Sequence, residues 1–469
     1  MLTRLQVDGF KNLRQVDLRF GPLTCIAGRN GVGKSNLFDA IALLSDLASM
    51  PLVKAATRVR GTGGRLSGIE QLFGGYGGTE PRIRMTAEMI VPRQVHDVFD
   101  RAAEATATCL RYTVALTLRK EAGAQEGPTL HLLEEELVAL SLEAAAQSLQ
   151  FQPGKAWRAK YLKGPGSRTR PFIEMLPEGA IKLWGDKGGK GGRPFAVPAD
   201  KSPQTVLAGI NASTHPTVLA AQREMQSWRM LQLEPTALRA PDEFSAENRL
   251  SPTGGHLPNT LKRVDCHAEL ANLLSELIPG VLRIDVDNDE ARQQRILRVT
   301  LRDRHPYDAS SLSDGTLRFV ALGLLGLDPL ATGLTCLEEP ENGIHPQRIP
   351  DVMRLVQRLA EDLPADDPDQ PALLTTSPRQ VIINTHSPLV VRDLDDDTLL
   401  MADIQRQQAR EWVAFKPLAD TWRADGLART AVVSKGMLTA YLGDDPVRLP
   451  RPSGKRTVQD HLQPDLFQT

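Results

Sequence analysis

The eight residues from Gly28 to Ser35, GRNGVGKS, constrain the fold of this chain more than any other segment. They match the pattern G-x-x-x-x-G-K-[ST], in which glycines let backbone amides curl around phosphate oxygens. The loop follows an apolar run, LTCIA, and precedes apolar residues at helical spacing, Leu37, Ile41 and Leu44. This order predicts a buried strand, a phosphate-binding loop and a helix, which are typical of an α/β fold.

The loop predicts a nucleotide site that uses a divalent metal. We expect the Lys34 ammonium to reach the β- and γ-phosphates and the Ser35 hydroxyl to bind Mg²⁺. The positive end of the following helix would point at the same anions. A glycine-rich turn without a ligand is the alternative, which the flanking strand and helix disfavour. The residues predicted to bind the nucleotide here are Gly28, Asn30, Gly31, Gly33, Lys34, Ser35 and Asn36.

Two neighbouring glutamates, Glu338 and Glu339, follow another apolar run, GLTCL. Adjacent carboxylates at the end of a buried strand repel each other and lose hydration, so a cation or a chemical role is expected nearby. Beside a phosphate loop, Glu338 would act on the metal through its waters, and Glu339 would orient or deprotonate the attacking water. The alternative is a surface helix start, where acids and proline are favoured.

Two further motifs carry polar groups at element ends. In LSDGT, Ser313 and Gly315 open an apolar helix, where a side chain and backbone amides can bind an anion. A plain helix cap explains the same residues. In NTHSP, His386 stands at the end of an apolar strand, where a lone histidine is usually structural.

Together these motifs resemble those of ABC-type P-loop ATPases of the SMC/RecF/OLD-like group. The resemblance covers about residues 1–80 and 300–400 and is weak between them. It implies an α/β P-loop NTPase fold, an ABC/RecF-like head with an antiparallel N-terminal lobe and an inserted α+β lobe. Besides the phosphate loop, its marks are GFKNL at 9–13, LSDGT at 312–316, CLEEPENGIHP at 336–346 and NTHSP at 384–388.

The resemblance also implies roles for single residues. Ser313 and Gly315 would be signature residues that reach across a dimer to the γ-phosphate of the partner's nucleotide, and His386 would be the switch histidine. Glu338 would be the metal-side acid and Glu339 the catalytic glutamate. The residues predicted to be catalytic are thus Glu339, His386 and Lys34, and those predicted for the metal are Ser35, Glu338 and, as a loose Q-loop match or else a surface glutamine, Gln71.

Two residues depart from the common ABC pattern. Asp314 replaces the first glycine of the usual signature, and Glu338 replaces the usual aspartate. At both positions the residue resembles the one found in this subgroup and differs from the one found in transporter ATPases.

The expected division is an N-terminal ATPase lobe at 1–95, an inserted lobe at 96–300, a C-terminal ATPase lobe at 301–450 and a tail at 451–469. Alternating residues at 82–91 and 110–119 predict an antiparallel sheet. Residues 260–280 predict one amphipathic helix, followed by a hairpin.

The net charge and the apolar runs of the sequence limit which nucleic-acid and membrane contacts can be expected. The net charge is −1, so a nucleic-acid surface would have to be a local patch. The N-terminus lacks a signal-peptide core, and the longest apolar run is about half of a membrane span. We therefore expect a cytoplasmic protein with no membrane contact.

Residues 155–193 form the one basic segment, with ten basic and three acidic residues. Trp157, Tyr161, Phe172 and Trp184 are interleaved with them and could stack on bases. A solvated basic face over core aromatics is the alternative, and an acidic protein partner is another.

The resemblance implies an ATPase that uses ATP and Mg²⁺. ATP would close a homodimer, and hydrolysis would reopen it, as a switch for DNA contact or a separately encoded effector in bacterial anti-phage defence. The alternatives are a RecF-type DNA-repair ATPase that binds DNA directly and, less favoured, a transporter ATPase subunit. We expect no nuclease domain of the OLD type, because Asp393 and Asp395 to Asp397 are better interpreted as a solvated acidic turn.

Overall fold

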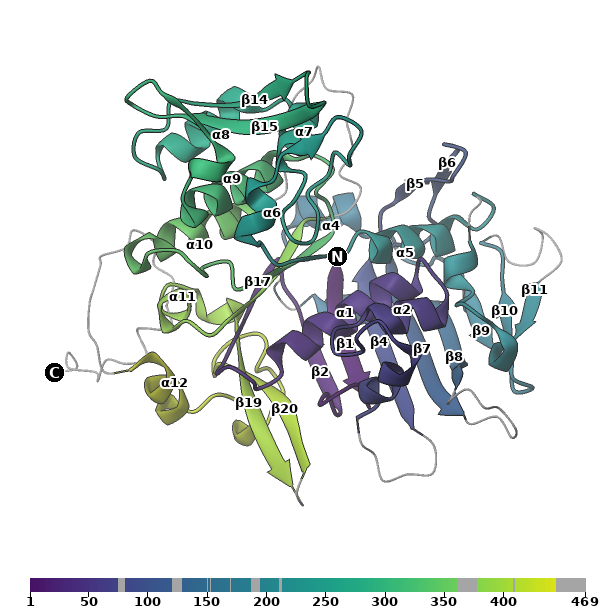
Figure 1. Ribbon diagram of the computed structural model, residues 1–469. Helices are drawn as coiled ribbons and strands as arrows, with labels where there is room; N and C mark the ends of the chain where they lie inside the picture. The colour runs from purple at the N-terminus through teal and green to yellow at the C-terminus, as the bar shows by residue number, and fades with distance from the viewer. Residues whose placement is uncertain are drawn as a thin grey trace.

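The computed structural model describes residues 1–74, 81–119, 129–149, 151, 153–168, 170–186, 195–210, 213–360, 378–407 and 410–443. Figure 1 shows two large sheets with helices packed on them and a helix-rich part above. The predicted α/β class is confirmed. The predicted tail at 451–469 lies outside the described residues.

A six-stranded sheet carries the motifs that the sequence singled out. Neighbouring strands are parallel except the last pair, so the carboxyl ends of the three motif-bearing strands meet at one edge. The strand order is β12 (Arg229–Leu231), β17 (Leu334–Glu338), β18 (Gln380–Thr385), β3 (Leu23–Ala27), β19 (Leu399–Gln407) and β20 (Arg410–Pro417).

An eight-stranded antiparallel sheet lies beside it (Figure 1). The two segments predicted to form an antiparallel sheet are paired neighbours, β4 and β7. The sheet joins strands from both sides of residue 95, where we predicted a domain boundary, and β12 from the predicted insert joins the six-stranded sheet. The proposed domain limits therefore stay a prediction. The strand order is β11 (Phe195–Pro198), β10 (Ala180–Leu183), β9 (Ile173–Met175), β8 (Thr129–Ala139), β7 (Cys109–Arg119), β4 (Arg82–Ile90), β1 (Leu2–Asp8) and β2 (Val16–Arg19).

The two faces of the six-stranded sheet belong to different hydrophobic cores. Alternate residues of β3 divide between them: Ile26 packs with the antiparallel sheet, whereas Cys25 and Ala27 pack with the helix-rich part. Because both faces are covered, these strands are continuous apolar runs. The first core also contains α1 (Lys34–Leu47), α2 (Leu52–Arg58) and α5 (Pro216–Gln226).

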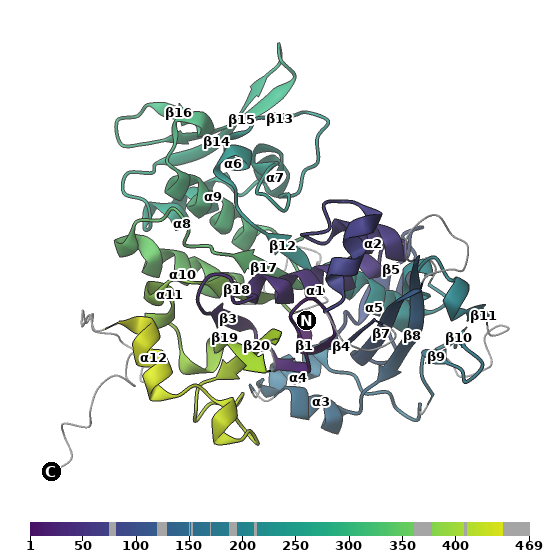
Figure 2. The ribbon, with the colours of Figure 1, turned by 60° about the horizontal axis from the view of Figure 1, so that its bottom comes forward.

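The helix-rich part covers the other face of the six-stranded sheet (Figure 2). The helix predicted at 260–280 is wrong as one element, because Asp265 takes a φ of 56° and ends the first of two helices. The hairpin predicted after it is confirmed. The elements are α6 (Pro235–Arg239), β13 (Asp242–Glu243), α7 (Leu257–Val264), α8 (His267–Ser275), β14 (Arg283–Asp289), β15 (Gln294–Thr300), β16 (Pro306–Asp308), α9 (Asp314–Leu327), α10 (Ile349–Leu359), α11 (Pro388–Arg392) and α12 (Lys435–Leu442).

Smaller elements complete the described chain. A two-stranded sheet, β5 with β6, stands apart from the larger ones. The remaining bounds are β5 (Gln94–His96), β6 (Ala102–Glu104), α3 (Leu142–Ser148) and α4 (Lys155–Tyr161), with 3₁₀ turns at Leu66–Leu72, Ala199–Lys201, Leu207–Gly209, Ala309–Ser311, Pro346–Arg348, Asp396–Thr398 and Arg429–Ala431.

Candidate nucleotide site

The phosphate loop connects β3 to α1 and curls around the Lys34 side chain. Gly31 and Gly33 have φ values of 78° and 110°, which side chains rarely tolerate. The Lys34 ammonium is buried and donates hydrogen bonds to the carbonyl oxygens of Gly28 (2.6 Å) and Arg29 (2.9 Å). Burial lowers the pKa of Lys34, and the carboxylates of Glu339 and Glu341 oppose that shift. The lysine predicted to bind phosphate therefore sits inside the loop.

Asn12, from the GFKNL motif, holds the loop from behind. Its side chain donates to the carbonyl oxygen of Val32 (3.1 Å) and accepts from the side chain of Asn36 (2.8 Å). A Cβ atom on Gly33 would lie 2.4 Å from the Asn12 amide nitrogen, so only glycine fits there. The motif could be recognised in the sequence, but this contact could not.

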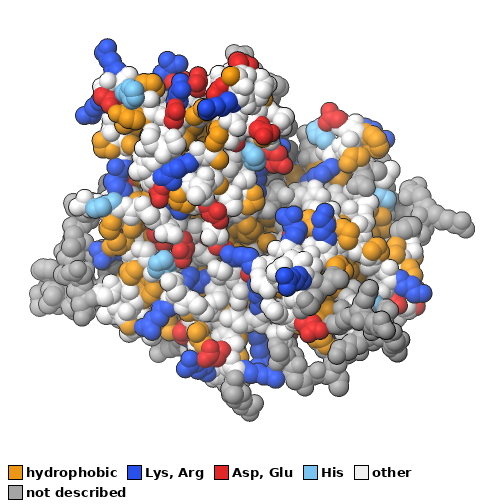
Figure 3. Space-filling model, in the orientation of Figure 1, with side chains coloured by type: hydrophobic (Ala, Val, Ile, Leu, Met, Phe, Trp, Pro, Cys, Tyr) orange, Lys and Arg blue, Asp and Glu red, His pale blue; other side chains and the backbone are white. Residues whose placement is uncertain are grey.

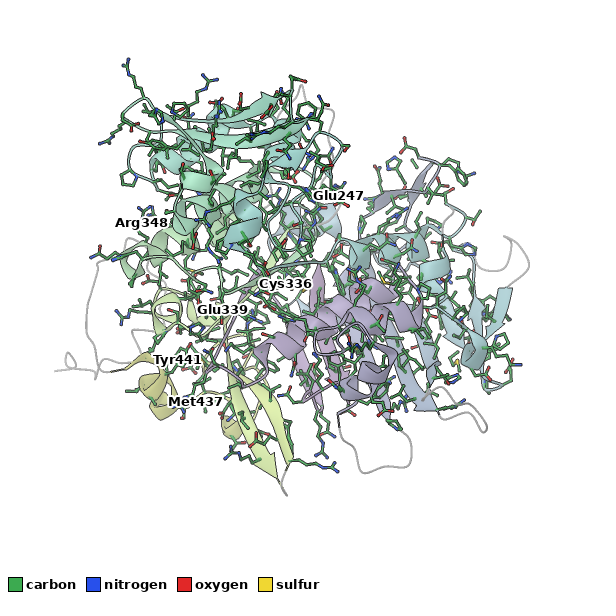
Figure 4. All side chains as sticks on the ribbon, in the orientation of Figure 1. Glu247, Cys336, Glu339, Arg348, Met437 and Tyr441 are labelled. Carbon is green, nitrogen blue, oxygen red and sulfur yellow. The ribbon has the colours of Figure 1, made fainter. Side chains whose placement is uncertain are left out.

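Glu339 stands beyond the end of β17, in a turn that β18 fixes. Figure 4 shows Cys336 within β17 and Glu339 past its end. Glu339 has a φ of 44°, and its amide donates to the backbone (3.1 Å) and side-chain (3.0 Å) oxygens of Asn384. The Nδ1 atom of His386 lies 2.8 Å from the Glu339 carboxylate. A strained backbone that neighbours hold in place is typical of functional sites.

The cation expected near the two glutamates is Arg60, which sequence reasoning missed. Its guanidinium donates to the carboxylates of Glu338 (2.8 Å) and Asp39 (2.7 Å) and to the carbonyl oxygen of Ser35 (3.2 Å). Lys11 binds the second Asp39 oxygen at 2.6 Å. Burial alone would lower the pKa of Arg60, but the hydrogen bonds to Glu338 and Asp39 outweigh it and raise that pKa.

Two of the residues predicted for the metal, Ser35 and Glu338, carry groups that fit a magnesium ion. The Arg60 guanidinium contacts the Glu338 carboxylate and the backbone carbonyl oxygen of Ser35, so these two oxygens lie around a point where a cation is stable. A hydroxyl and a carboxylate are oxygen ligands of the kind Mg²⁺ prefers. Among the described side chains, no group of three or more His, Cys, Asp or Glu could hold a metal.

A third carboxylate, Glu341, lies buried behind Glu339. One oxygen accepts from the Thr385 hydroxyl, and that hydroxyl accepts from the Ser387 amide (2.9 Å). Burial raises the pKa of Glu341, opposed by the Thr385 hydrogen bond. These contacts link the turn after β17 to the segment that carries His386.

Comparisons with known proteins match this arrangement. A family model described as "AAA domain, putative AbiEii toxin, Type IV TA system" matches residues 23–87 and 259–392. A DNA replication and repair protein RecF from Phocaeicola vulgatus is 46% identical over 46 residues, which is 10% of this chain and 12% of that protein. An OLD nuclease from Thermus scotoductus is 52% identical over 44 residues, 9% of this chain and 8% of that protein.

The chain is similar to ABC-type P-loop ATPases of the SMC/RecF/OLD-like group, because the family model matches it in two segments and the RecF and OLD relatives match shorter ones. The aligned segments span 12% and 8% of the RecF and OLD relatives, so the chain matches only a small part of either protein. The crystal structure of an Smc head bound to the C-winged helix domain of ScpA superimposes with a TM-score of 0.42 at 12% identity, over 89% of this chain and 98% of that one. No described helix of the chain combines the length and apolar character that a bilayer-spanning segment requires.

The residues predicted for the signature lie on a different element from the phosphate loop. Ser313 caps α9: its hydroxyl accepts from the amide of Thr316 (3.2 Å) and lies 2.9 Å from the Thr316 hydroxyl. Gly315 is in the first turn, and Asp314 pairs with Arg239. Figures 1 and 2 both show α9 in the helix-rich part and α1 beside the antiparallel sheet. The predicted helix cap is confirmed, whereas the contact across a dimer stays a prediction.

Gln71 has no demonstrated part in the ATPase site. It is exposed near the end of the 3₁₀ turn Leu66–Leu72. Arg60, and not Gln71, makes the observed contacts with Ser35 and Glu338. Its predicted role at the metal stays a prediction.

Two of the aromatic residues in the basic segment are core residues. Phe172 and Tyr161 are buried, as the interpretation of a solvated basic face over core aromatics expects, so these two rings are not available to stack on bases. Trp184 is half-buried, donates to Glu174 (2.7 Å) and has the Lys182 ammonium 3.9 Å from its ring centroid. Lys187, Lys190 and Arg193 lie outside the described residues.

Proposed function

We propose that this ATPase is a switch: two copies close on two Mg-ATP molecules and reopen when ATP is hydrolysed to ADP and phosphate. The observation that carries the proposal is the Glu339–His386 pair beside the phosphate loop. A carboxylate fixed by a histidine, next to a lysine buried in a phosphate loop, is suited to orient water against a γ-phosphate.

The residues of the chain have distinct tasks in this cycle. Lys34 exchanges the carbonyl oxygens of Gly28 and Arg29 for phosphate oxygens. Glu339 orients the attacking water and accepts its proton, and His386 holds the Glu339 carboxylate in place. Ser35 and Glu338 would hold Mg²⁺, which neutralises charge on the phosphates when bound.

The second half of each site would come from another copy of the chain. Ser313 bonds only within the start of its own helix among the described contacts, so its helix end is available to an anion outside this chain. Such a composite site explains why a signature helix and a phosphate loop occur on separate elements. It makes assembly depend on nucleotide.

What the switch controls is proposed from the family match. The matching model is described in terms of a toxin of a type IV toxin–antitoxin system. This supports a separately encoded effector in bacterial anti-phage defence as the controlled partner. The second relative is named as an OLD nuclease, so nuclease activity is one activity found among the proteins that this chain resembles.

The solution mass of Glu339→Gln, with and without Mg-ATP, tests the switch. This variant should bind ATP, fail to hydrolyse it and shift to a larger species. Lys34→Ala is the matched control and should not shift, because its phosphate loop lacks the lysine. If Glu339→Gln binds ATP without changing mass, ATP does not control assembly and the switch proposal is wrong.

Direct DNA binding, as in a RecF-type repair ATPase, is the second candidate. Three exposed basic residues on α4, Lys155, Arg158 and Lys160, favour it. On the face shown in Figure 3, however, basic and acidic side chains are interspersed. Salt-sensitive DNA binding that is lost on neutralising the three α4 residues would support this candidate. Unchanged binding would remove α4 as the DNA surface.

A further inference from the structure

Helix α12 lies beyond the segments that the family model matches, but it packs against the strand that leads into the phosphate loop. The second matched segment ends at residue 392, whereas α12 covers Lys435–Leu442. Its apolar side chains pack in the same hydrophobic core as Cys25 and Ala27, at the end of β3. Figure 4 shows Tyr441 and Met437 on this helix. The helix therefore brings a tyrosine, for which the motifs give no role, to the strand end before the loop.

The Tyr441 hydroxyl is buried and has no hydrogen-bond partner among the described residues. Burial raises the pKa of Tyr441, the Cys25 thiol and the Glu341 carboxylate add to that shift, and the backbone amide of Gly28 opposes it. These groups are therefore neighbours of the hydroxyl, and Gly28 is the first residue of the phosphate loop. A buried polar group without a partner has an energetic cost, so the position of this hydroxyl requires an explanation.

Glu341 provides an acceptor atom that also lacks a partner. The residue is only 6% exposed, and its Oε1 atom accepts from the Thr385 hydroxyl. Its Oε2 atom is buried and has no hydrogen-bond partner in the described part of the chain. The Glu341 charge acts on Cys25 and Lys34 as well as on Tyr441, so the carboxylate lies at the base of the phosphate loop. A donor and an acceptor, both buried and both open, thus occur in one region.

Nucleotide binding would change the charge in this region. In the free chain the Lys34 ammonium is held by the carbonyl oxygens of Gly28 and Arg29, and its charge also faces Glu341. In the proposed cycle Lys34 turns to the phosphates, which weakens its attraction to the Glu341 carboxylate. A buried carboxylate that loses a cation needs another donor to remain stable. The Tyr441 hydroxyl is a buried donor that has no other partner to give up.

We propose that Tyr441 is a positioning residue of the nucleotide site, whose hydroxyl donates a hydrogen bond to the Glu341 carboxylate when Mg-ATP is bound and not in the free chain. The proposal rests on the proposed function, because it concerns the same nucleotide-bound state. The new bond holds the turn that carries Glu339 while Lys34 is engaged with the phosphates. Tyr441 does not touch the nucleotide and acts through Glu341.

Urea unfolding without nucleotide and calorimetric titration with Mg-ATP test Tyr441→Phe in the full chain. The midpoint of urea unfolding should stay the same or rise, because the substitution removes a buried hydroxyl that has no partner in the free chain. ATP affinity should fall about tenfold, because the bound state loses a hydrogen bond to a charged group. In a Glu341→Gln background, Tyr441→Phe should change ATP affinity no further, because the acceptor is already gone.

Tyr112→Phe is the matched control, because the Tyr112 hydroxyl is also buried but donates to Glu135 at 3.2 Å within the antiparallel sheet. It should unfold at a lower urea concentration and bind ATP as the native chain does.

The Tyr441 proposal is wrong if Tyr441→Phe loses stability without nucleotide, because its hydroxyl then already has a partner, such as a water molecule. It is also wrong if ATP affinity does not change, or if the same loss of affinity persists in the Glu341→Gln background. If the native chain does not bind Mg-ATP, the proposed function itself fails.

Discussion

The phosphate-loop side of the molecule and the signature side differ in how much each completes within one chain. Around the phosphate loop, Asn12, Arg60 and His386 come from distant segments and bond to Asn36, Glu338 and Glu339. Around the signature, Ser313 bonds to Thr316, three residues along the same helix start. The first side is built to hold a ligand by itself. In the proposed composite site, the second would meet a ligand that another copy of the chain supplies.

The largest expected effect is on ATP hydrolysis, in a mixture of one variant from each side of the molecule. Lys34→Ala and Ser313→Arg should each lose nearly all ATP hydrolysis, because each spoils both composite sites of a symmetric dimer. Lys34→Ala should also lose ATP binding, whereas Ser313→Arg should keep it. Mixing the two inactive proteins should restore part of the hydrolysis rate, because each heterodimer has one intact site.

Hydrolysis assays on the mixture check the outcome, with equilibrium titration of each parent as the control for binding. No recovery, although both parents fold and associate, would contradict a site shared between two chains.

A smaller effect on ATP affinity is expected from removing the Asn12 side chain, which is hydrogen-bonded to the phosphate loop. Asn12→Ala removes hydrogen bonds to Val32 and Asn36, and ATP affinity should weaken about tenfold, which corresponds to the loss of one buried hydrogen-bonding group. The ATP-dependent mass shift of Glu339→Gln should survive in the double variant at saturating ATP. If assembly is lost instead, Asn12 serves the signature side and the two sides are not separable.

Arg60→Ala tests the cation on the metal side. Its loss leaves Glu338 without this partner, and we expect the free energy of unfolding to fall by about 1–2 kcal/mol, because the hydrogen bonds are charged but the guanidinium is partly exposed. Arg58→Ala is the matched control: its pair with Asp46 is exposed, so a change within about 0.5 kcal/mol is expected. Urea unfolding of both variants measures the two changes in the free energy of unfolding. Equal effects would mean that the Arg60 contacts add nothing.

The smallest expected effect is a pH dependence confined to the phosphate-loop side. Because burial lowers the pKa of Lys34, the free protein loses this proton at a lower pH than an exposed lysine does. The nucleotide binds the protonated form, so ATP affinity should fall as pH rises toward the ordinary lysine pKa of about 10.4. Titrations of Ser313→Arg should show the same fall. An affinity that stays constant over this range would show that Lys34 keeps its proton.

The sequence predicted the site where local pattern and chemistry coincide. Lys34, Glu338 and His386 each follow an apolar strand, and parallel strands bring their carboxyl ends to one edge, so their meeting could be expected. Arg60 could not be predicted in this way, because nothing in the sequence around an arginine in a glycine-rich loop indicates that it pairs with Glu338, 278 residues away. The antiparallel sheet was predicted from β4 and β7, but its continuation to β11 depends on non-local pairing that alternation does not specify.

The Arg60 contacts give the metal side of the site an internal counter-ion. With the guanidinium on Glu338 and Asp39, the carboxylates are neutralised before any nucleotide arrives. In the proposed cycle, loading Mg-ATP would exchange one cation for another, and the affinity for Mg-ATP would be the difference between two favourable states. Such an exchange would leave the carboxylates paired with Arg60 while no nucleotide is bound. It also lets the spent nucleotide leave without exposing a cluster of bare negative charge.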